Sequence, residues 1–197
     1  MRQAQTRGLK VVITVSTLAL LVGLLSATAL GLFTDSDTVG ANAFSTGTID
    51  LVVSPTSAVV TFNGMVPGDQ VTAPLTVTNG PGGAQLRYAV TSTTTENTLA
   101  GQLQLTVKSG VTTCTSAGFG GSGTVLYGPA ALGNTTPLAI IGNAAQGAQA
   151  GDRTLAVGAS EALCFNVSLP IATGNAFQNL STTATFTFDS EQTANNP

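Results

Sequence analysis

The sequence contains no histidine and no tryptophan, and the first of these absences removes whole classes of enzyme. Without histidine there can be no Ser-His-Asp triad, no Cys-His dyad, no HExxH zinc motif and no imidazole general base. Charged residues are also scarce, at 8% of the 197 residues, whereas a typical soluble protein has about 25%. Only six residues are basic and the net charge is −3, so the composition argues against nucleic-acid binding.

Low charge does not indicate disorder in this chain, because hydrophobic residues make up 43% of it. The length suits one domain of ordinary size together with a leader. A domain of this size can bury a complete hydrophobic core.

The N-terminus has the pattern of an export signal. Half of the basic residues lie in the first ten positions, namely Arg2, Arg7 and Lys10. The uncharged run Val11–Phe33 follows and ends in small residues. We therefore expect residues 1–31 to form a cleavable hydrophobic signal helix, so that the mature protein is secreted. A permanent membrane anchor is the alternative, because the run is long enough to span a bilayer.

Two small-x-small sites are available to a signal peptidase. One would place the cut before Leu30 and the other between Gly31 and Leu32. The leader is the only part of the chain for which we expect contact with a membrane.

The two cysteines, Cys114 and Cys164, both follow the leader. In an oxidising compartment a disulfide is the first expectation, closing a loop of about 50 residues that is worth on the order of 4 kcal/mol. Two free buried thiols are the alternative. Two cysteines without histidine are a poor donor set for zinc, so we expect no cofactor. Two acidic pairs, Asp35 with Asp37 and Asp189 with Glu191, suit a hard cation only weakly, and we interpret them as solvated acids.

The body of the chain has the pattern of an all-β protein. In its clearest run, Ser181–Phe188, apolar and hydroxyl side chains alternate, which gives a strand one apolar face. Similar runs predict about seven further strands: Ile49–Val53, Ala58–Phe62, Val71–Thr78, Leu86–Val90, Leu103–Lys108, Gly123–Tyr127 and Leu163–Leu169. Strands of this number and spacing, separated by Gly and Pro turns, favour a two-sheet β-sandwich.

Three stretches of the body do not have a strand pattern. Short helical turns are expected at Glu96–Gly101 and Thr173–Gln178. The Ala- and Gly-rich stretch Gly128–Gly151 has no clear period, and we predict a long excursion between strands there.

A set of short motifs follows the leader in a fixed order. Leu32-Phe33-Thr34-Asp35 is followed by Phe44-Ser45-Thr46-Gly47-Thr48-Ile49-Asp50-Leu51, by Val66-Pro67-Gly68-Asp69 and by Leu75-Thr76-Val77-Thr78-Asn79-Gly80. This set resembles the TasA/camelysin family of exported bacterial proteins. The C-terminal Phe186-Thr187-Phe188-Asp189-Ser190-Glu191-Gln192-Thr193 is similar to the endings of that family.

The resemblance implies a jelly-roll sandwich that assembles with copies of itself into extracellular fibres of the biofilm matrix. It also implies cleavage between Gly31 and Leu32 by a SipW-type signal peptidase. In such fibres the freed N-terminal segment of one copy completes a sheet of the next copy. Here that donor segment would start at Leu32 and run toward Phe44, with Phe33 and Val39 as its other large apolar side chains.

The expected organisation is therefore a signal peptide (1–31), an N-terminal tail or donor segment (32–43), a β-sandwich domain (44–192) and a C-terminal tail (193–197). We expect a non-enzymatic structural protein of the extracellular matrix or cell surface. The alternatives are a monomeric cell-surface binding module or adhesin, and a secreted endopeptidase of the camelysin type.

Overall fold

The computed structural model describes residues 49–56 and 64–196, which lie in one compact unit, Thr46–Pro197. The predicted signal helix, the cleavage site at Gly31 and Leu32, the donor segment 32–43 with Phe44, and the predicted strand Ala58–Phe62 lie outside the described residues. Within 49–56 and 64–196, no helix is long and apolar enough to cross a membrane.

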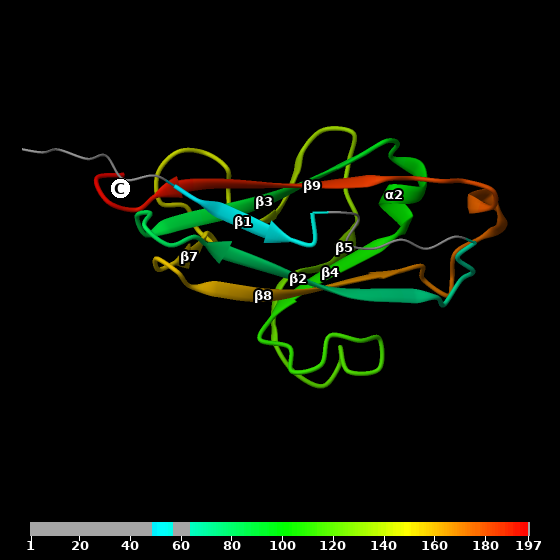
Figure 1. The fold of residues 1–197 in the computed structure, drawn as a ribbon. Coiled ribbons are helices and arrows are strands. Elements are labelled where there is room, and N and C mark those ends of the chain that lie inside the picture. Colours follow the sequence, from blue (N-terminus) through cyan, green and yellow to red (C-terminus); the bar gives the residue numbers. More distant parts are fainter. Residues whose placement is uncertain (1–48, 57–63, 197) are drawn as a thin grey trace, which may run out of the picture. The chain divides into compact units, whose positions relative to one another are not determined.

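The described residues form nine strands and two short helical segments (Figure 1). The strands are β1 (Leu51–Ser54), β2 (Gln70–Asn79), β3 (Leu86–Thr94), β4 (Gln104–Ser109), β5 (Thr124–Ala131), β6 (Leu138–Ile141), β7 (Arg153–Leu155), β8 (Ser160–Ser168) and β9 (Ala184–Gln192). The helical segments are α2 (Thr98–Gln102) and a 3-10 turn at Asn175–Phe177. Both lie inside the stretches predicted to be helical, apart from the last residue of α2.

The strands form two sheets, and every strand pair is antiparallel. One sheet has five strands in the order β1-β2-β8-β4-β5. In the other, β3 pairs with β9 along one edge and with β7 and β6, one after the other, along its opposite edge. The predicted two-sheet β-sandwich is thereby confirmed.

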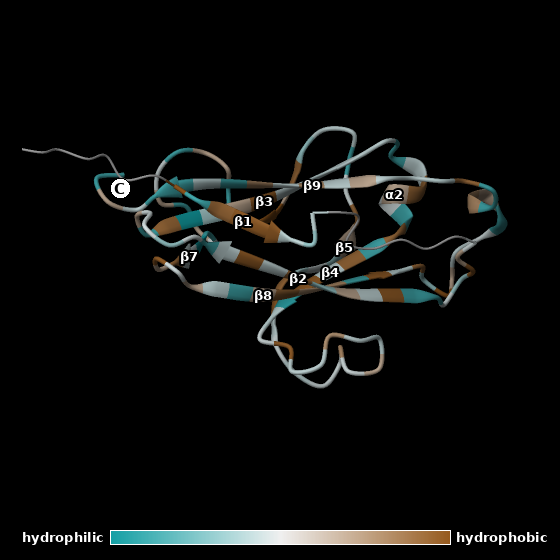
Figure 2. Cartoon of the chain, viewed as in Figure 1, coloured by the Kyte–Doolittle hydropathy of each residue, from teal (hydrophilic) through white to brown (hydrophobic). Residues whose placement is uncertain are grey.

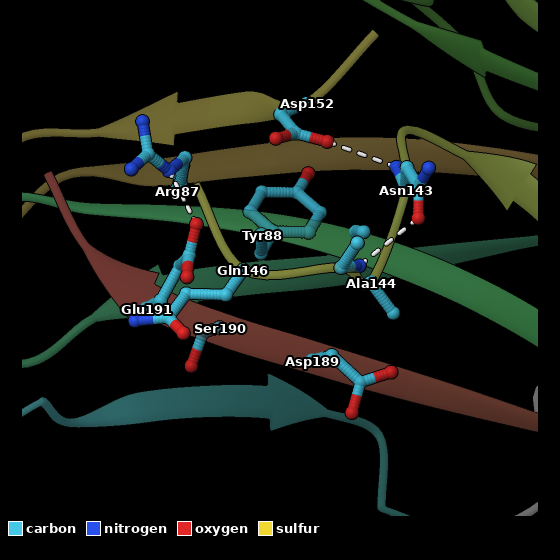
Figure 3. A pocket seen from close by; sticks show the side chains of 11 residues that line it. Arg87, Tyr88, Asn143, Ala144, Gln146, Asp152, Asp189, Ser190 and Glu191 are labelled. Atoms are coloured by element: carbon cyan, nitrogen blue, oxygen red, sulfur yellow. Dashed lines mark hydrogen bonds and ion pairs between the residues drawn. The ribbon is translucent and has the colours of Figure 1, made fainter. Parts of the chain in front are cut away.

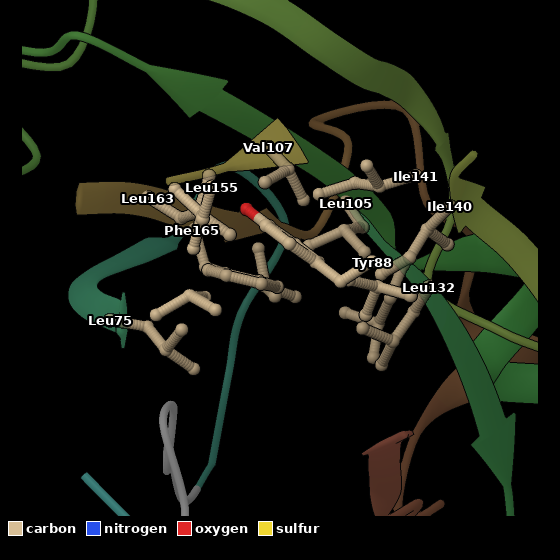
Figure 4. Close-up of a cluster of buried hydrophobic side chains, with 14 of the residues drawn as sticks. Leu75, Tyr88, Leu105, Val107, Leu132, Ile140, Ile141, Leu155, Leu163 and Phe165 are labelled. Carbon is tan, nitrogen blue, oxygen red and sulfur yellow. The ribbon is translucent and has the colours of Figure 1, made fainter. Parts of the chain in front are cut away.

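The core lies between the two sheets, where the apolar faces of the alternating strands meet (Figure 4). Leu75 and Val77 of β2 and Leu163 and Phe165 of β8 are at most 1% exposed. Tyr88 of β3 packs among them from the second sheet. Figure 2 shows the same division along the strands, with hydrophobic and hydrophilic segments in turn. Period-two alternation therefore explains why these residues form strands.

The prediction of an excursion without strands over Gly128–Gly151 is wrong. Strand β5 continues to Ala131, and β6 lies within the stretch. The pairing of β3 with β6 shifts register between Val90 and Thr91, which oppose Ile141 and Ala139, so Ile140 is an extra residue. A β-bulge of this kind lets Ile140 and Ile141 both be buried, and it removes the alternation on which the prediction relied.

Candidate functional site

Two of the motifs after the leader turn out to build the ends of the sandwich. In the Pro67-Gly68-Asp69 turn, the Val66 amide donates to Asp69 Oδ2 at 2.9 Å. Gly68 has a φ of +99°, which glycine adopts without strain. The Gly68 amide donates to the Leu169 carbonyl at 2.8 Å, and the Leu169 amide donates to the Asp69 carbonyl at 2.9 Å. The turn therefore ties the start of β2 to the end of β8.

The Asn-Gly motif closes β2 at the opposite end. Asn79 is completely buried, and its Nδ2 donates to the carbonyls of Ala84 at 3.0 Å and Leu155 at 3.1 Å. The Gly80 amide donates to the Asp50 carbonyl at 2.7 Å. A Cβ at Gly80 would come within 1.9 Å of Asp50 Oδ2, so any other residue here would displace the Asp50 side chain. The motif residues Asp50, Asn79 and Gly80 thus form one structural unit.

One side of the sandwich is closed and the other is open. On the closed side, β5 at the edge of the five-stranded sheet lies against β6 of the other sheet. Strands β1 and β9 are therefore the edges on the opposite side, as Figure 1 also shows. Among the described residues, β1 pairs only with β2, and β9 pairs only with β3. We call the edges of β1 and β9 the open side.

The core is only partly covered along the open side. Leu51 and Val53 of β1 and Phe186 and Phe188 of β9 pack against the core but remain half-buried, unlike the apolar residues of the central strands. The centre of the Phe186 ring lies 5.0 Å from the centre of the Phe165 ring of β8, so Phe186 reaches across the sandwich. Apolar side chains at an unpaired edge form a surface that an added strand could complete.

Strand β9 has little of the usual protection against strand addition, since its only charged residues are Asp189 and Glu191 in its C-terminal half. Its sequence, Ala184-Thr185-Phe186-Thr187-Phe188-Asp189-Ser190-Glu191-Gln192, contains neither proline nor lysine, and it pairs with β3 over nine residues without a register shift. The closed side differs, because β5 contains Pro129 and its pairing with β4 shifts register twice. The edge of β9 is therefore a place in the described structure where another strand could add.

On the outer face of β3 and β9 the loop 142–152 forms a pocket of about 240 Å³, lined by polar side chains and by three alanines (Figure 3). Arg87 is buried there and its Nε donates to Glu191 Oε1 at 2.6 Å. Glu191 also accepts from the Gly147 amide at 3.0 Å and from Asn196 Nδ2 at 2.7 Å. The hydrogen bond from Arg87, followed by those from Asn196 and Gly147, holds the pKa of the Glu191 carboxyl below its usual range. Glu191 is thus engaged by its own chain and also orders the C-terminal residues.

A second polar cluster closes the core at the end where β8 begins. Tyr88 Oη donates to Glu161 Oε2 at 2.7 Å, and Arg153 of β7 pairs with the same carboxylate. Burial, and then the hydrogen bond to Glu161, raise the pKa of the Tyr88 hydroxyl. This cluster satisfies polar groups that would otherwise be buried without partners, which is a structural role.

The predicted disulfide is present, with Cys114 and Cys164 bonded and their Cα atoms 5.6 Å apart. Cys164 lies on the outer face of β8, so the bond fixes loop 110–123 on the five-stranded sheet. Lys108 beneath this loop donates to the Phe119 carbonyl at 2.8 Å and lies 4.6 Å from the centre of the Phe119 ring.

The structure therefore brings together some of the residues proposed from the sequence and not others. The acidic pair Asp189 and Glu191 lies on one strand, with Glu191 bound to Arg87. Leu32, Phe33, Asp35, Asp37, Val39 and Phe44 lie outside the described residues. The open side was not identified from the sequence. The alternation of Thr and Phe in β9 predicts a strand but does not distinguish an edge strand from a central one.

Residues 8–98 match a family model described as camelysin metallo-endopeptidase. No curated protein gives a significant match to the chain. The match covers most of the predicted leader, the predicted donor segment 32–43, β1 to β3 and the two motif turns. It agrees with the resemblance to the TasA/camelysin family that the motifs indicated.

The description of the matched family implies a catalytic metal, and the donor set of this chain does not fit one. There is no histidine in the sequence, and both cysteines are consumed by the disulfide. Within 49–56 and 64–196, no group of three or more Cys, Asp and Glu side chains comes together. A zinc endopeptidase site needs three protein ligands, usually histidines with a carboxylate, so we derive no hydrolytic step for this chain.

Proposed function

Since residues 8–98 match the camelysin family model, we propose that this protein is an exported, non-enzymatic structural subunit. It associates with copies of itself into fibres of the extracellular or biofilm matrix. The observation that carries the proposal is the open side, where the edge of β9 and the half-buried Phe186 and Phe188 can accept a strand.

The strand that adds is the N-terminal segment of a neighbouring copy, 32–43, freed when the leader is removed between Gly31 and Leu32. Its main chain hydrogen-bonds along β9, and its apolar side chains, such as Val39, cover the exposed part of the core. Because donor and acceptor are different surfaces of one chain, each added copy presents a new acceptor edge. Contacts of this kind do not close, so they produce filaments.

Main-chain and apolar contacts, not ion pairs, hold the copies together. Beyond the leader, three basic residues face nine acidic ones, so the copies repel one another. Each of the three already has a partner in its own chain: Arg87 binds Glu191, Arg153 binds Glu161, and Lys108 binds the Phe119 carbonyl. Salt screens the repulsion between like-charged copies, so assembly accelerates as ionic strength rises.

The proposal is tested by comparing a chain that begins at Leu32 with one that begins at Thr46, where the compact unit starts. The first forms filaments in negative-stain microscopy, and the second stays monomeric at the same concentration. Val39→Asp in the longer chain is the matched variant. It keeps the length of the donor but places a charge where an apolar residue is needed, so we expect it to stay monomeric. Filaments from the chain that begins at Thr46 would rule out this donor segment.

The absence of peptidase activity is tested separately. We expect the mature chain to leave casein intact with and without added zinc. Cleavage that a chelator abolishes would contradict the non-enzymatic assignment.

A second candidate function, a monomeric binding module or adhesin on the cell surface, is favoured by the pocket of Figure 3. Its walls include Asn143, Gln146 and Asp189, which can hydrogen-bond the hydroxyls of a glycan. This function would be supported if the mature chain remained monomeric and bound a glycan with an affinity that Gln146→Ala and Asp189→Ala both reduced.

A further inference from the structure

Two exposed apolar side chains lie at the end of the sandwich where β2 begins and β8 ends. Val66 is 59% exposed and Ile171 is 81% exposed. They flank Gly68, whose Cβ position lies 3.0 Å from Ile171 Cδ1. Hydrogen bonds of Leu169 with Gly68 and Asp69 hold the loop before β2 against the loop after β8. We call Val66 and Ile171 the apolar tip.

The opposite end of the sandwich carries a second exposed apolar pair. Ile49 is 41% exposed and Val157 is 48% exposed. The Gly80 amide binds the carbonyl of Asp50, next to Ile49, and the Asn79 amide binds the carbonyl of Ala159, near Val157. Both residues therefore lie at the end where β2 finishes, opposite the tip, and we call this pair the apolar base.

The base is also the end at which the chain enters the sandwich, because Leu51 at the start of β1 pairs with Asn79. In the proposed assembly, the donor segment precedes Ile49 in the sequence and would reach its neighbour from the base. A copy that receives this donor would then lie beyond the base, and when the copies point in the same direction it presents its tip there.

We propose that the apolar tip of one copy packs on the apolar base of the next copy, as an end-to-end contact along the filament. This inference rests on the proposed function, since it takes the neighbour to be a second copy of this chain. A second copy is favoured as the partner because one domain carries two apolar pairs at its opposite ends. The three basic side chains beyond the predicted leader are engaged within their own chain, so apolar contacts rather than ion pairs would join the copies. Tip and base are different surfaces, so the contact does not close.

The test replaces Ile171 by serine in the chain that begins at Leu32 and measures the lowest concentration at which filaments form. Burying one isoleucine side chain changes an association constant by about tenfold or more, so Ile171→Ser raises this concentration about tenfold. Val125→Ser is the matched control, because Val125 is 49% exposed but lies on β5, away from both ends. Unchanged assembly of Ile171→Ser, or an equal effect of Val125→Ser, would overturn the proposal. Thermal melts of each variant verify that the fold is retained.

Cross-linking gives a second, positive readout. A mixture of Ile171→Cys and Val157→Cys chains forms a disulfide-linked dimer on oxidation, whereas neither variant alone does so. A dimer from Ile171→Cys alone would indicate a two-fold contact between tips and overturn the head-to-tail arrangement.

The outcomes separate this proposal from the donor mechanism. If the chain that begins at Leu32 forms filaments and Ile171→Ser leaves its assembly unchanged, the end contact alone is overturned. Filaments of a chain that begins at Thr46, if Ile171→Ser weakens them, overturn the donor segment and support the end contact. If the unsubstituted chain that begins at Leu32 forms no filaments, both the donor mechanism and the end contact are overturned.

Discussion

Replacement of Asn79 by aspartate tests the turn that ends β2. The Asn79 side chain is completely buried, and its Nδ2 donates to two carbonyl oxygens, those of Ala84 and Leu155. In Asn79→Asp a carboxyl oxygen takes the place of this NH2 group. The ionised form would face both carbonyls without a donor, so the folded variant must keep the carboxyl protonated. Even then it can donate to only one of the two carbonyls.

The magnitude follows from the protonation equilibrium. An aspartate has an ordinary pKa of about 3.9, so keeping it protonated at pH 7 costs about 4 kcal/mol at 1.36 kcal/mol per unit. The lost hydrogen bond adds about 1 kcal/mol. Because the pKa in the folded state is raised above that of the unfolded state, the stability of the variant is highest below about pH 4. It falls by about 1.4 kcal/mol per pH unit as the pH rises toward the folded pKa.

Urea unfolding of the wild type and the variant at pH 4, 5, 6 and 7 measures this difference. We expect the loss of unfolding free energy to grow from about 1 kcal/mol at pH 4 to about 5 kcal/mol at pH 7. Asn79→Ala is the control, because it removes the same hydrogen bonds without adding a titratable group, and its loss stays constant with pH. A loss in Asn79→Asp that does not vary with pH would refute the reasoning.

Three further predictions concern stability. The double variant Cys114→Ala/Cys164→Ala loses about 4 kcal/mol in urea unfolding, because the bond joins residues 50 apart in sequence and restricts the unfolded chain; a loss below about 1 kcal/mol would contradict this. Gly80→Ala destabilises the fold by about 1–2 kcal/mol because its Cβ overlaps Asp50 Oδ2. Asp50→Ala in the same chain restores most of that loss in a double-mutant cycle, and simple additivity would rule out the contact. Glu161→Gln keeps an acceptor oxygen but removes the negative charge that pairs with Arg153, and it costs about 1–2 kcal/mol, since Arg153 is 34% exposed. It also lowers the pKa of Tyr88, measured by phenolate absorbance, and an unchanged titration would show that burial alone raises that pKa.

Strands with unbroken alternation were predictable from the sequence. The regular runs within β2, β4, β8 and β9 each place apolar side chains at every second position, and each became a strand with bounds within three residues of the prediction at its N-terminal end. The pairing of Cys114 with Cys164 was also predictable, because a chain with two cysteines has one intramolecular choice. The strands β6 and β7 were missed because one contains a bulge at Ile140 and the other has three residues.

The candidate site could not be predicted in the same way. Phe186 and Phe188 look in the sequence like any inward-facing pair of a strand, and Arg87 looks like a solvated cation. Their exposure depends on strands and loops that are distant in sequence. The Phe side chains stay half-buried, and among the described residues β9 pairs along one edge only, whereas Arg87 is buried beside loop 142–152.

By itself, the order of amino acids determined the secondary structure class, the inward face of each regular strand and the exclusion of histidine chemistry, because these depend on residue type and on spacing of two residues along one strand. Only the tertiary structure decided which strands became edges, which side of the sandwich stayed open and which exposed apolar residues gathered at its two ends. The physical reason is that an edge is defined by the strand that fails to pair with it, and pairing joins segments such as β3 and β9 that lie about 100 residues apart in the chain.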